Sequence, residues 1–372
     1  MPVLKKIIVQ NFRNIELQEL EFSPNVNCIS GGNGEGKTNL IDAIYYLSMT
    51  KSAFGGPDSF NVRYGTEGFA IAGFYDMPDS LGRDSTIRFS VQATGGEKKV
   101  KKDDKLYTKI SEHIGVLPIV MVSPSDSSLV SESGEERRKF VNSVLSQIDR
   151  EYLKALQQYN RLLAQRNSLL KSGNADEALL STFDEEMSAL AKPIFDKREM
   201  FVRQLMPIVG QYYEAISGGR EKVGIEYRSD ISERSLAEIL AARRDKDRIF
   251  KYTTAGIQRD DFLFSMNGEP IRRCGSQGQQ KSFLVALKFA QYEIMKDRYH
   301  YAPMLLLDDL FDKLDIGRIE NLLTMVAGND FGQIFLTDCD TERTKGIVER
   351  ITADRAYFVA SGGTFRRTDG KE

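Results

Sequence analysis

The chain is poor in the residues that most often build metal centres and nucleophilic triads. It has only two histidines, His113 and His300, among 372 residues, which argues against a zinc site and against a Ser-His-Asp triad. Its three cysteines, Cys28, Cys274 and Cys339, lie far apart and form no Cys-x-x-Cys pair. A sparse and odd number of cysteines is typical of a reducing compartment and argues against a disulfide framework. We therefore expect a cytoplasmic protein that uses neither zinc nor disulfides.

Long apolar runs and a strong charge bias are also lacking. No uninterrupted apolar stretch is long enough to cross a membrane, and the first residues, MPVLKKIIVQNFRN, contain no small-residue cleavage site. We expect neither a membrane span nor a secretory signal. The net charge of −2 does not indicate nucleic-acid binding by the chain as a whole, so any such binding would need a local basic face, for example one formed on assembly.

Strand patterns occupy both ends of the chain. The N-terminal part predicts strands in LKKIIVQ, IELQELEF, NVNCIS, GFAIAGFYDM, STIRFSVQAT and LPIVMVS, with the lysine run GEKKVKKDDKLY at a hairpin between the last two. The C-terminal part predicts strands in KYTTAG, DFLFSMNGEPI, GQIFLTD and RAYFVA. The Asn-Gly pair in DFLFSMNGEPI favours a tight turn, and the continuous apolar run APMLLLDDL suits a buried parallel strand.

Residues 134–216 have a helical pattern instead. Apolar residues recur at intervals of three and four on both sides of a break at KSGNADEA, which predicts a helical hairpin. These apolar residues are Leu145, Ile148, Tyr152, Ala155, Tyr159, Leu162 and Leu169 before the break, and Phe183, Met187, Leu190, Ile194, Phe201, Leu205, Ile208 and Tyr212 after it. A helical subdomain packed on a core is the main interpretation, and a short protruding arm is the alternative.

The most specific motif is GGNGEGKT, residues 31–38, which matches the phosphate-loop pattern G-x-x-x-x-G-K-[ST] at every fixed position. It follows a predicted strand and opens a predicted helix, as this motif requires. Backbone N–H groups of such a loop surround a diphosphate at the helix N-terminus. We expect Lys37 to reach the β- and γ-phosphates of ATP and Thr38 to bind Mg²⁺. The predicted nucleotide-binding residues of the loop are Gly31, Gly32, Asn33, Gly34, Glu35, Gly36, Lys37 and Thr38.

An acidic strand end, LLLDDL, supplies the carboxylates that a phosphate-loop ATPase needs. Asp308 is the candidate for holding Mg²⁺, and Asp309 is the candidate base that polarises the attacking water. The alternative is a solvated strand terminus. Because Asp309 is one methylene shorter than the glutamate usual in related ATPases, we expect slow hydrolysis.

A second candidate anion-binding element lies far downstream in RRCGSQGQQKSF, residues 272–283. Small and amide residues precede another predicted helix, so the Ser276 hydroxyl and nearby backbone N–H groups are available to a γ-phosphate. An ordinary loop is the alternative. In a head-to-tail two-fold dimer each such element caps the nucleotide held by the other subunit, as in ABC-type ATPases.

Five segments in the same order resemble the RecF family, bacterial recombination and repair ATPases of the ABC group that includes the SMC proteins. They are NFRNIELQELEFSPNVNCISGGNGEGKTNLIDAIYYL, SPSDSSLVSESGEERRKFVN, RDDFLFSMNG, CGSQGQQKSFLVALKFAQ and LLLDDLFDKLD. The resemblance runs from about residue 4 to residue 340. It implies an α/β ABC-type P-loop ATPase head with an inserted helical lobe. We divide the chain into one ATPase half at 1–125, the helical lobe at 126–250 and the second ATPase half at 251–372.

The resemblance also implies roles for individual residues. Arg13 and Asn14 would lie beside the nucleotide, and Asp315 would be the D-loop residue at the dimer seam. The trans signature would consist of Ser276, Gln277, Gly278 and Gln279. Such a protein would bind duplex DNA near single-strand gaps as an ATP-bound dimer and would cooperate with RecO and RecR to load the recombinase RecA.

Basic clusters are candidates for the DNA contact, although each is also typical of a solvated face. Our first choice is the cluster of Lys98, Lys99, Lys101, Lys102 and Lys105, because a hairpin can project it beyond the core. The other two clusters are Arg137, Arg138 and Lys139, and Arg243, Arg244, Lys246 and Arg248.

Two further functions stay open on the sequence alone. A small-molecule phosphotransferase would need a pocket for the phosphate acceptor, and it would not need a signature segment that reaches the nucleotide of a second subunit. The presence of GSQGQQ therefore argues against this function. An SMC-like ATPase serving a nuclease or defence complex is the other alternative. The break KSGNADEA has no Cys-x-x-Cys, which argues against a zinc-hook coiled coil.

Overall fold

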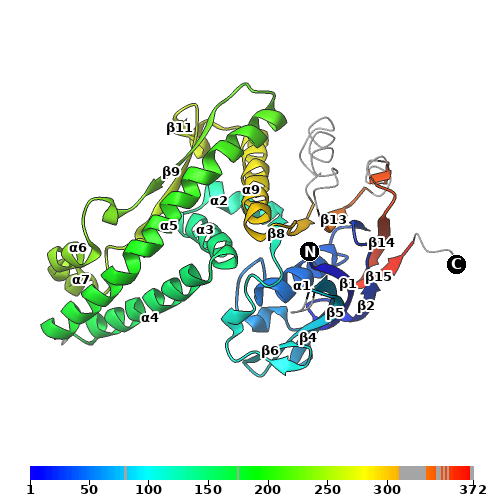
Figure 1. Ribbon diagram of the computed structural model, residues 1–372, viewed down its shortest axis with the longest axis horizontal. Coiled ribbons are helices and arrows are strands. Elements are labelled where there is room, and N and C mark those ends of the chain that lie inside the picture. The colour runs from blue at the N-terminus through cyan, green and yellow to red at the C-terminus, as the bar shows by residue number, and fades with distance from the viewer. Residues whose placement is uncertain are drawn as a thin grey trace. The chain divides into compact units, whose positions relative to one another are not determined.

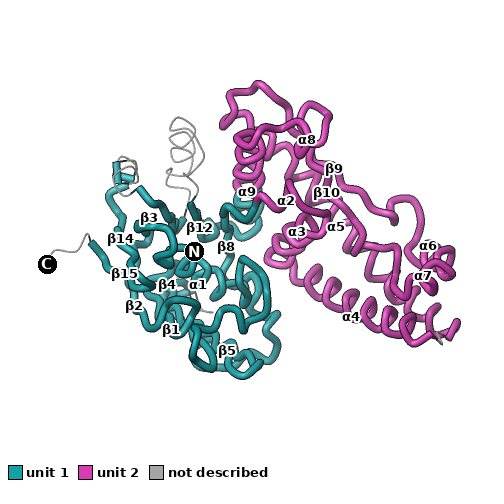
Figure 2. Tube along the Cα trace, turned by 180° about the vertical axis from the view of Figure 1, so that it is seen from behind, with its two compact units in different colours: residues 1–126, 291–372 teal, residues 127–290 magenta. Residues whose placement is uncertain are grey.

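The computed structural model describes residues 1–78, 82–173, 176–309, 332–340, 345–346, 348–349 and 352–368. The chain forms two compact units (Figure 2). Unit 1 comprises residues 1–126 and 291–372, and unit 2 comprises residues 127–290. Within the described ranges, no helix has the length and apolarity needed to cross a membrane.

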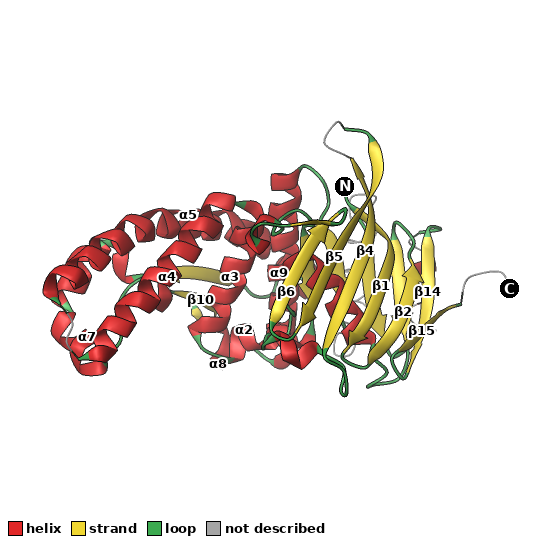
Figure 3. Cartoon of the chain, turned by 90° about the horizontal axis from the view of Figure 1, so that it is seen from below, coloured by secondary structure: helices red, strands yellow, loops and turns green. Residues whose placement is uncertain are grey.

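Unit 1 contains an antiparallel sheet whose described strands have the order β2-β1-β4-β5-β6-β7. Figure 3 shows β6, β5, β4, β1 and β2 side by side in this sheet. The strands are β1 (Val3–Phe12), β2 (Ile15–Glu21), β4 (Gly68–Pro78), β5 (Asp84–Thr94), β6 (Glu97–Lys102) and β7 (Lys105–Leu106). One face is apolar because alternate residues point to it, for example the buried Ile7 and Val9 of β1, and a bulge between Leu4 and Lys6 brings Leu4 into the same core.

A second, mostly parallel sheet positions the phosphate loop. Its described strands have the order β15-β14-β3-β13-β12-β8, and only the β14–β15 pair is antiparallel. They are β3 (Val26–Ser30), β8 (Ile119–Val122), β12 (Met304–Leu307), β13 (Ile334–Asp338), β14 (Arg355–Ser361) and β15 (Thr364–Arg367). The strands β3, β8, β12 and β13 are buried along their whole length, which explains the continuous apolar sequences of β8 and β12.

Helix α1 (Lys37–Met49) contacts strands of both sheets of unit 1. Its residues Ile41, Ala43, Ile44 and Leu47 are all fully buried, so the helix is apolar around most of its circumference. The cores of the two sheets and of α1 form one continuous cluster. The first turn of α1 is therefore held rigidly, and that turn carries two fixed positions of the phosphate-loop pattern, Lys37 and Thr38.

The lysine run of residues 98–105 is itself paired in the sheet. Strand β6 contains most of it, and the hairpin turn falls at Asp103 and Asp104, which both have positive φ angles of 45° and 64°. We predicted a hairpin here but placed the strands on either side of the run. Aspartate adopts this left-handed backbone more readily than most residues, which explains the position of the turn.

Unit 2 is built around the predicted helical hairpin, α4 (Arg150–Ser172) and α5 (Glu177–Ser217), which run antiparallel and side by side (Figure 1). Tyr152, Tyr159, Met187, Phe201 and Leu205 of this hairpin are buried, as the spacing predicted. The other helices are α2 (Ser128–Ser131), α3 (Gly134–Ile148), α6 (Leu236–Ala242), α7 (Arg244–Phe250), α8 (Ile271–Cys274) and α9 (Gln277–Tyr299). Helix α9 continues beyond Ala290 into the residues of unit 1.

The sheet of unit 2 contains β9 (Val223–Arg228), β10 (Asp261–Met266) and β11 (Glu269–Pro270), all antiparallel. The predicted Asn-Gly turn is confirmed, because Asn267 and Gly268 join β10 to β11 with φ angles of 50° and 85°. The predicted strand at KYTTAG is wrong. The backbone N–H groups of Thr253 and Thr254 donate to side chains, Asn167 Oδ1 at 2.8 Å and Asp247 Oδ1 at 2.9 Å, and not to a neighbouring strand.

The second boundary of the helical lobe lies further along the chain than the one we predicted. We placed it at residue 250, whereas unit 2 extends to Ala290. The reason is strand pairing, because β10 pairs along its length with β9, which follows directly after α5. Residues 251–290 therefore pack with the lobe.

Candidate nucleotide site

The phosphate loop lies between β3 and α1, where its glycines allow a backbone that other residues adopt with difficulty. Gly31, Gly34 and Gly36 have φ angles of 151°, 84° and 102°. Gly36 is also closely packed, since a Cβ atom there would lie 2.7 Å from Asn14 Nδ2. A side chain at position 36 would therefore displace Asn14 and distort the start of α1.

Lys37 is folded back onto the loop that precedes it. Its ammonium donates to the carbonyl oxygens of Gly31 at 2.9 Å and Gly32 at 3.0 Å, and Cys339 Sγ lies 3.6 Å away. The side chain is only 4% exposed. A buried ammonium that contacts backbone carbonyls is placed to exchange these partners for an anion bound inside the loop.

The predicted Mg²⁺ ligands meet although they are far apart in the sequence. Thr38 Oγ1 lies 3.0 Å from each carboxylate oxygen of Asp308, at the end of β12. Thr337, at the end of β13, donates to Asp308 Oδ1 at 2.8 Å and accepts from the backbone N–H of Asp309 at 2.9 Å. Thr337 meets Asp308 because neighbouring parallel strands bring their carboxyl ends to one edge of the sheet.

The electrostatics of this cluster favour the neutral form of one carboxyl. Burial, together with the charge of Asp309, raises the pKa of Asp308 from its ordinary value of 3.8 to about 6. Hydrogen bonds from Thr337 and Thr38 and the charge of Lys37 lower the pKa, but they do not outweigh burial. A bound cation would therefore stabilise the ionised form of Asp308.

These residues fit a bound Mg²⁺. The ion prefers hard oxygen donors, and it is often held by one or two carboxylates together with water and substrate phosphates. Thr38 and Asp308 provide a hydroxyl and a carboxylate within hydrogen-bond distance of each other. Among the described residues no cluster of three or more His, Cys, Asp or Glu side chains offers a cage made by the protein alone. Such an ion would supply charge neutralisation for phosphates at the loop.

Asp309 differs from Asp308 in exposure and backbone. It is half-buried and has a positive φ of 43°. This left-handed backbone is rare outside glycine, and asparagine and aspartate adopt it most readily. The predicted D-loop residue Asp315 lies outside the described residues.

Arg13 and Asn14 lie on the same side of α1 but have different surroundings. Asn14 contacts the loop at Gly36 and accepts from Asn39 Nδ2 at 2.7 Å. The guanidinium of Arg13 forms an ion pair with buried Asp42 at 2.7 Å. It also donates to Asn61 Oδ1, Asn39 Oδ1 and Ser52 Oγ. Its described contacts are thus with α1 and the segment after it, not with the phosphate loop.

The remaining loop residues contact other strand ends. Glu35 accepts from the backbone N–H groups of Gly362 and Gly363, in the turn between β14 and β15. Asn33 Oδ1 lies 2.9 Å from the thiol of Cys339, which is free and exposed. Both contacts restrict the outer part of the loop.

The signature segment, residues 275–279, lies in unit 2 at the start of α9. The side chains and backbones of Ser276 and Gln279 form a reciprocal cap: Ser276 N–H donates to Gln279 Oε1 at 2.7 Å, and Gln279 N–H donates to Ser276 Oγ at 3.3 Å. Ser276 and Gln277 are exposed, and Gly278 is half-buried. The exposed thiol of Cys274 lies just before this segment.

The five lysines of the first basic cluster do not share one face. Lys98 and Lys102 pair with the buried residues Ala93 and Phe89, whereas Lys99 pairs with Gln92 and Lys101 with Ser90. Lys105 pairs with Lys102. Lys98 Nζ donates to Thr50 O at 2.8 Å and forms an ion pair with Asp58 at 2.8 Å. The predicted single basic face is wrong for this reason, since alternate residues of a strand point to opposite sides.

The arginine cluster near α7 is tied to acidic residues. Arg244 binds Glu177 and Asp184, Arg248 binds Glu177, and Arg243 binds Asp230. The pairs of Arg244 and Arg248 join α7 to the N-terminal end of α5, whereas the pair of Arg243 joins it to the segment after β9. They reduce the positive charge available to a polyanion.

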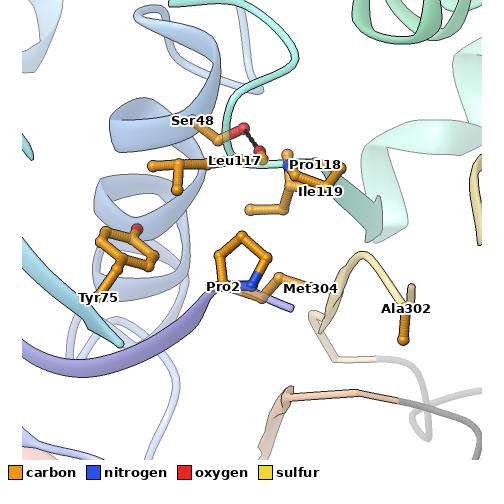
Figure 4. Close-up of a pocket in the computed structure, with 8 residues that line it drawn as sticks. All are labelled: Pro2, Ser48, Tyr75, Leu117, Pro118, Ile119, Ala302 and Met304. Carbon is orange, nitrogen blue, oxygen red and sulfur yellow. Dashed lines mark hydrogen bonds between the residues drawn. The ribbon is translucent and has the colours of Figure 1, made fainter. Parts of the chain in front are cut away.

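A small pocket in unit 1 contains none of the predicted site residues (Figure 4). Pro2, Leu117 and Met304 line it, together with Ser48 and Tyr75. The buried Tyr75 hydroxyl has no described hydrogen-bond partner, while Ser48 donates to Leu117 O. It lacks the convergent polar groups expected of an acceptor site for phosphoryl transfer.

A family model described as RecF/RecN/SMC N terminal domain matches residues 3–354. The DNA replication and repair protein RecF of Bacteroides fragilis is 42% identical over 371 residues, which cover 100% of both chains. The protein of the same description from Flavobacterium johnsoniae is 41% identical over 351 residues, covering 93% of this chain and 96% of the relative.

The chain belongs to the RecF family.

Solved structures agree with this assignment. A structure described as the recombination mediator protein RecF with ATP in the RecFOR pathway has a TM-score of 0.87 at 29% identity, covering 99% of this chain and 98% of that chain. The Smc head domain from Pyrococcus furiosus has a TM-score of 0.58 at 15% identity and covers 99% of this chain and 96% of that chain, which shows a shared fold. The predicted fold class, an ABC-type ATPase head with an inserted helical lobe, is confirmed for this RecF-family chain.

Proposed function

We propose that this chain binds ATP and Mg²⁺ at the phosphate loop and uses slow hydrolysis as a switch. The observation that carries the proposal is the meeting of Thr38 and Asp308 at 3.0 Å beside buried Lys37, although 270 residues separate them in the sequence. A hydroxyl and a carboxylate at the edge of a phosphate loop are the groups that hold Mg²⁺ on a nucleotide. The ATP named for the solved relative supports the same ligand.

Asp309 is the base in this proposal. It follows Asp308 directly, and its backbone is fixed by Thr337. Its short side chain places the carboxylate further from the attacking water than a glutamate would, so turnover is slow. Asp315 is the D-loop residue at the dimer seam.

The ATP-bound form is a head-to-tail dimer in which residues 276–279 contact the nucleotide of the partner. Ser276 presents its exposed hydroxyl at the N-terminus of α9, where backbone N–H groups favour an anion. The dimer binds duplex DNA near single-strand gaps in the cytoplasm and cooperates with RecO and RecR to load the recombinase. Hydrolysis releases it.

Light scattering with and without ATP, Mg²⁺ and duplex DNA tests this proposal. The wild-type protein should be monomeric without nucleotide and dimeric with ATP under non-hydrolysing conditions. Ser276→Arg should bind ATP as a monomer and fail to dimerise, because a bulky cation replaces a small hydroxyl at the seam. Ser172→Arg, at an exposed serine of α4, is the matched control. If Ser276→Arg still dimerises with ATP, residues 276–279 are an ordinary loop and do not contact the partner's nucleotide.

A further inference from the structure

Glu221 holds the signature segment through the side chain of Gln279. Its Oε1 accepts from Gln279 Nε2 at 2.7 Å, across 58 residues of sequence. The oxygen of the same amide, Gln279 Oε1, accepts from Ser276 N–H at 2.7 Å. One glutamine amide thus joins Glu221 to the residue that presents its hydroxyl at the start of α9.

Only one orientation of the Gln279 amide satisfies both contacts. In a flipped amide, the NH₂ group would face the Ser276 N–H, which places a donor against a donor. The amide oxygen would face the Glu221 carboxylate, which places an acceptor against an acceptor. The Glu221 carboxylate therefore fixes the orientation of the amide. That orientation in turn allows the reciprocal cap between Ser276 and Gln279.

Glu221 is itself held in place by the fold. It lies between the end of α5 and the start of β9, and Tyr213 of α5, which is buried, donates to Glu221 Oε2 at 3.4 Å. The next residue, Lys222, exchanges two hydrogen bonds with Asn267: Lys222 N–H donates to Asn267 Oδ1 at 2.9 Å, and Asn267 N–H donates to Lys222 O at 2.7 Å. The carboxylate is thus supported by α5 and by the β10–β11 turn.

We propose that Glu221 is a positioning residue for the signature segment and keeps Ser276 and the first turn of α9 in the conformation that receives a phosphate from a second copy of this chain. The inference rests on the proposed function, because it assigns Glu221 to the same composite site. Glu221 acts through Gln279 and needs no contact with the nucleotide. Its hydrogen-bond acceptor, and not its charge, is the property that matters.

Two substitutions separate these properties. Glu221→Ala removes the acceptor and leaves the Gln279 amide free to rotate. Glu221→Gln keeps an acceptor oxygen for Gln279 Nε2 and removes the negative charge near the incoming phosphate. Glu226→Ala is the matched control, because Glu226 is exposed in the adjacent strand β9 and pairs with its neighbour Arg228.

Hydrogen exchange of the nucleotide-free monomer tests the positioning directly. Glu221→Ala should exchange faster than the wild-type protein in a peptide that covers residues 274–282, and Glu221→Gln should match the wild type. This measurement does not depend on ATP or on a dimer. It therefore reports on Glu221 even if the proposed function fails.

Sedimentation with ATP under non-hydrolysing conditions tests the consequence. Glu221→Ala should bind ATP normally and dimerise about tenfold or more weakly, because the freed Gln279 amide and Ser276 must then be ordered when the dimer forms. Glu221→Gln should dimerise at least as tightly as the wild type. In a Gln279→Ala background, Glu221→Ala should have no further effect.

Three results would overturn the inference. One is unchanged exchange in Glu221→Ala. Another is faster hydrogen exchange in Glu221→Ala together with dimerisation as strong as that of the wild type. In that case Glu221 would stabilise the segment locally without affecting the dimer. The third is a Glu221→Gln protein as impaired as Glu221→Ala. Absence of ATP-driven dimers in the wild-type protein would instead refute the proposed function.

Discussion

Thr38 Oγ1 lies 3.0 Å from both carboxylate oxygens of Asp308, and this carboxyl has a pKa of about 6. The ionised form of Asp308 is thus less stable in the folded protein than in the unfolded chain. A cation bound beside Asp308 would offset this unfavourable ionisation. Two properties of Asp308 can therefore be separated by experiment, its effect on stability without Mg²⁺ and its effect on nucleotide binding with Mg²⁺.

Asp308→Asn should stabilise the metal-free protein at neutral and higher pH. The rise of the pKa from 3.8 to about 6 corresponds to about 3 kcal/mol. Between these two values the folded state binds more protons than the unfolded state, so the free energy of unfolding falls as pH rises and then stays constant. Asp308→Asn should lack this fall and should unfold at a higher temperature than the wild type at pH 8 in EDTA, but not at pH 4. A lower unfolding temperature at pH 8 would contradict the assigned pKa.

Lys37→Ala should weaken ATP binding by at least about tenfold, because the substitution removes a charge-assisted hydrogen bond to phosphate. Equilibrium binding of a fluorescent ATP analogue measures the effect. Lys109→Ala, at an exposed lysine of the same unit, should bind like the wild type. Equal ATP affinity in both variants would show that Lys37 does not contact the phosphates of ATP.

Asp309→Asn should keep ATP bound and should block hydrolysis by a factor of about 100 or more. The positive φ of 43° at this position makes asparagine the suitable substitution, since it adopts the left-handed backbone readily. Single-turnover phosphate release, measured beside ATP affinity, separates the two steps. Wild-type hydrolysis by Asp309→Asn would show that another group is the base.

Arg13→Ala should destabilise unit 1 rather than change ATP affinity alone. Burial raises the pKa of Asp42, and the charge of Arg13 opposes this rise, so removing Arg13 leaves a buried carboxylate without its cation. Breaking such a pair typically costs about 3–5 kcal/mol. Thermal unfolding measures the destabilisation, with Arg63→Ala as the control, because the partner Glu16 of Arg63 is exposed. Equal unfolding temperatures for the two variants would show that the Arg13–Asp42 pair contributes little.

Lys99→Glu combined with Lys101→Glu should weaken duplex DNA binding by the ATP-bound protein. These two lysines lie on one face of β6, whereas Lys98 is engaged with Asp58. The slope of log affinity against log salt should decrease by about 0.9 for each phosphate that is no longer neutralised by a lysine. Anisotropy across a salt series measures it. Lys154→Glu combined with Lys192→Glu, on exposed helix positions of unit 2, gives the same change of net charge. An equal slope in both double variants would place the DNA-binding face elsewhere.

The sequence predicted the parts of the site that depend on local spacing. The phosphate loop between β3 and α1, the buried strand before Asp308 and the turn at Asn267 and Gly268 all follow from short-range rules of turns, helices and strands. The helical hairpin follows from its apolar spacing in the same way. These features need no knowledge of the rest of the chain.

The parts that depend on distant contacts were not predictable. Thr337 reaches Asp308 only because β13 pairs with β12, and Glu221 reaches Gln279 only because β9 pairs with β10. The boundary of the helical lobe also depends on the β9–β10 pair. The lysine cluster differs in the opposite way, because its residues are adjacent in sequence but strand alternation places Lys98 and Lys99 on opposite faces of β6.

The two exposed thiols give the protein a set of native chemical probes. Cys339 lies beside Lys37 and Asn33 at the phosphate loop, and Cys274 lies just before the signature segment, whereas Cys28 is buried. In a head-to-tail dimer, a short bifunctional maleimide would crosslink Cys339 of one copy to Cys274 of the other. The crosslink would detect the dimer interface. Spin labels at the same two thiols would follow its opening in real time. The unmodified chain therefore carries reporter positions at both halves of the proposed composite site, with no engineered cysteine required.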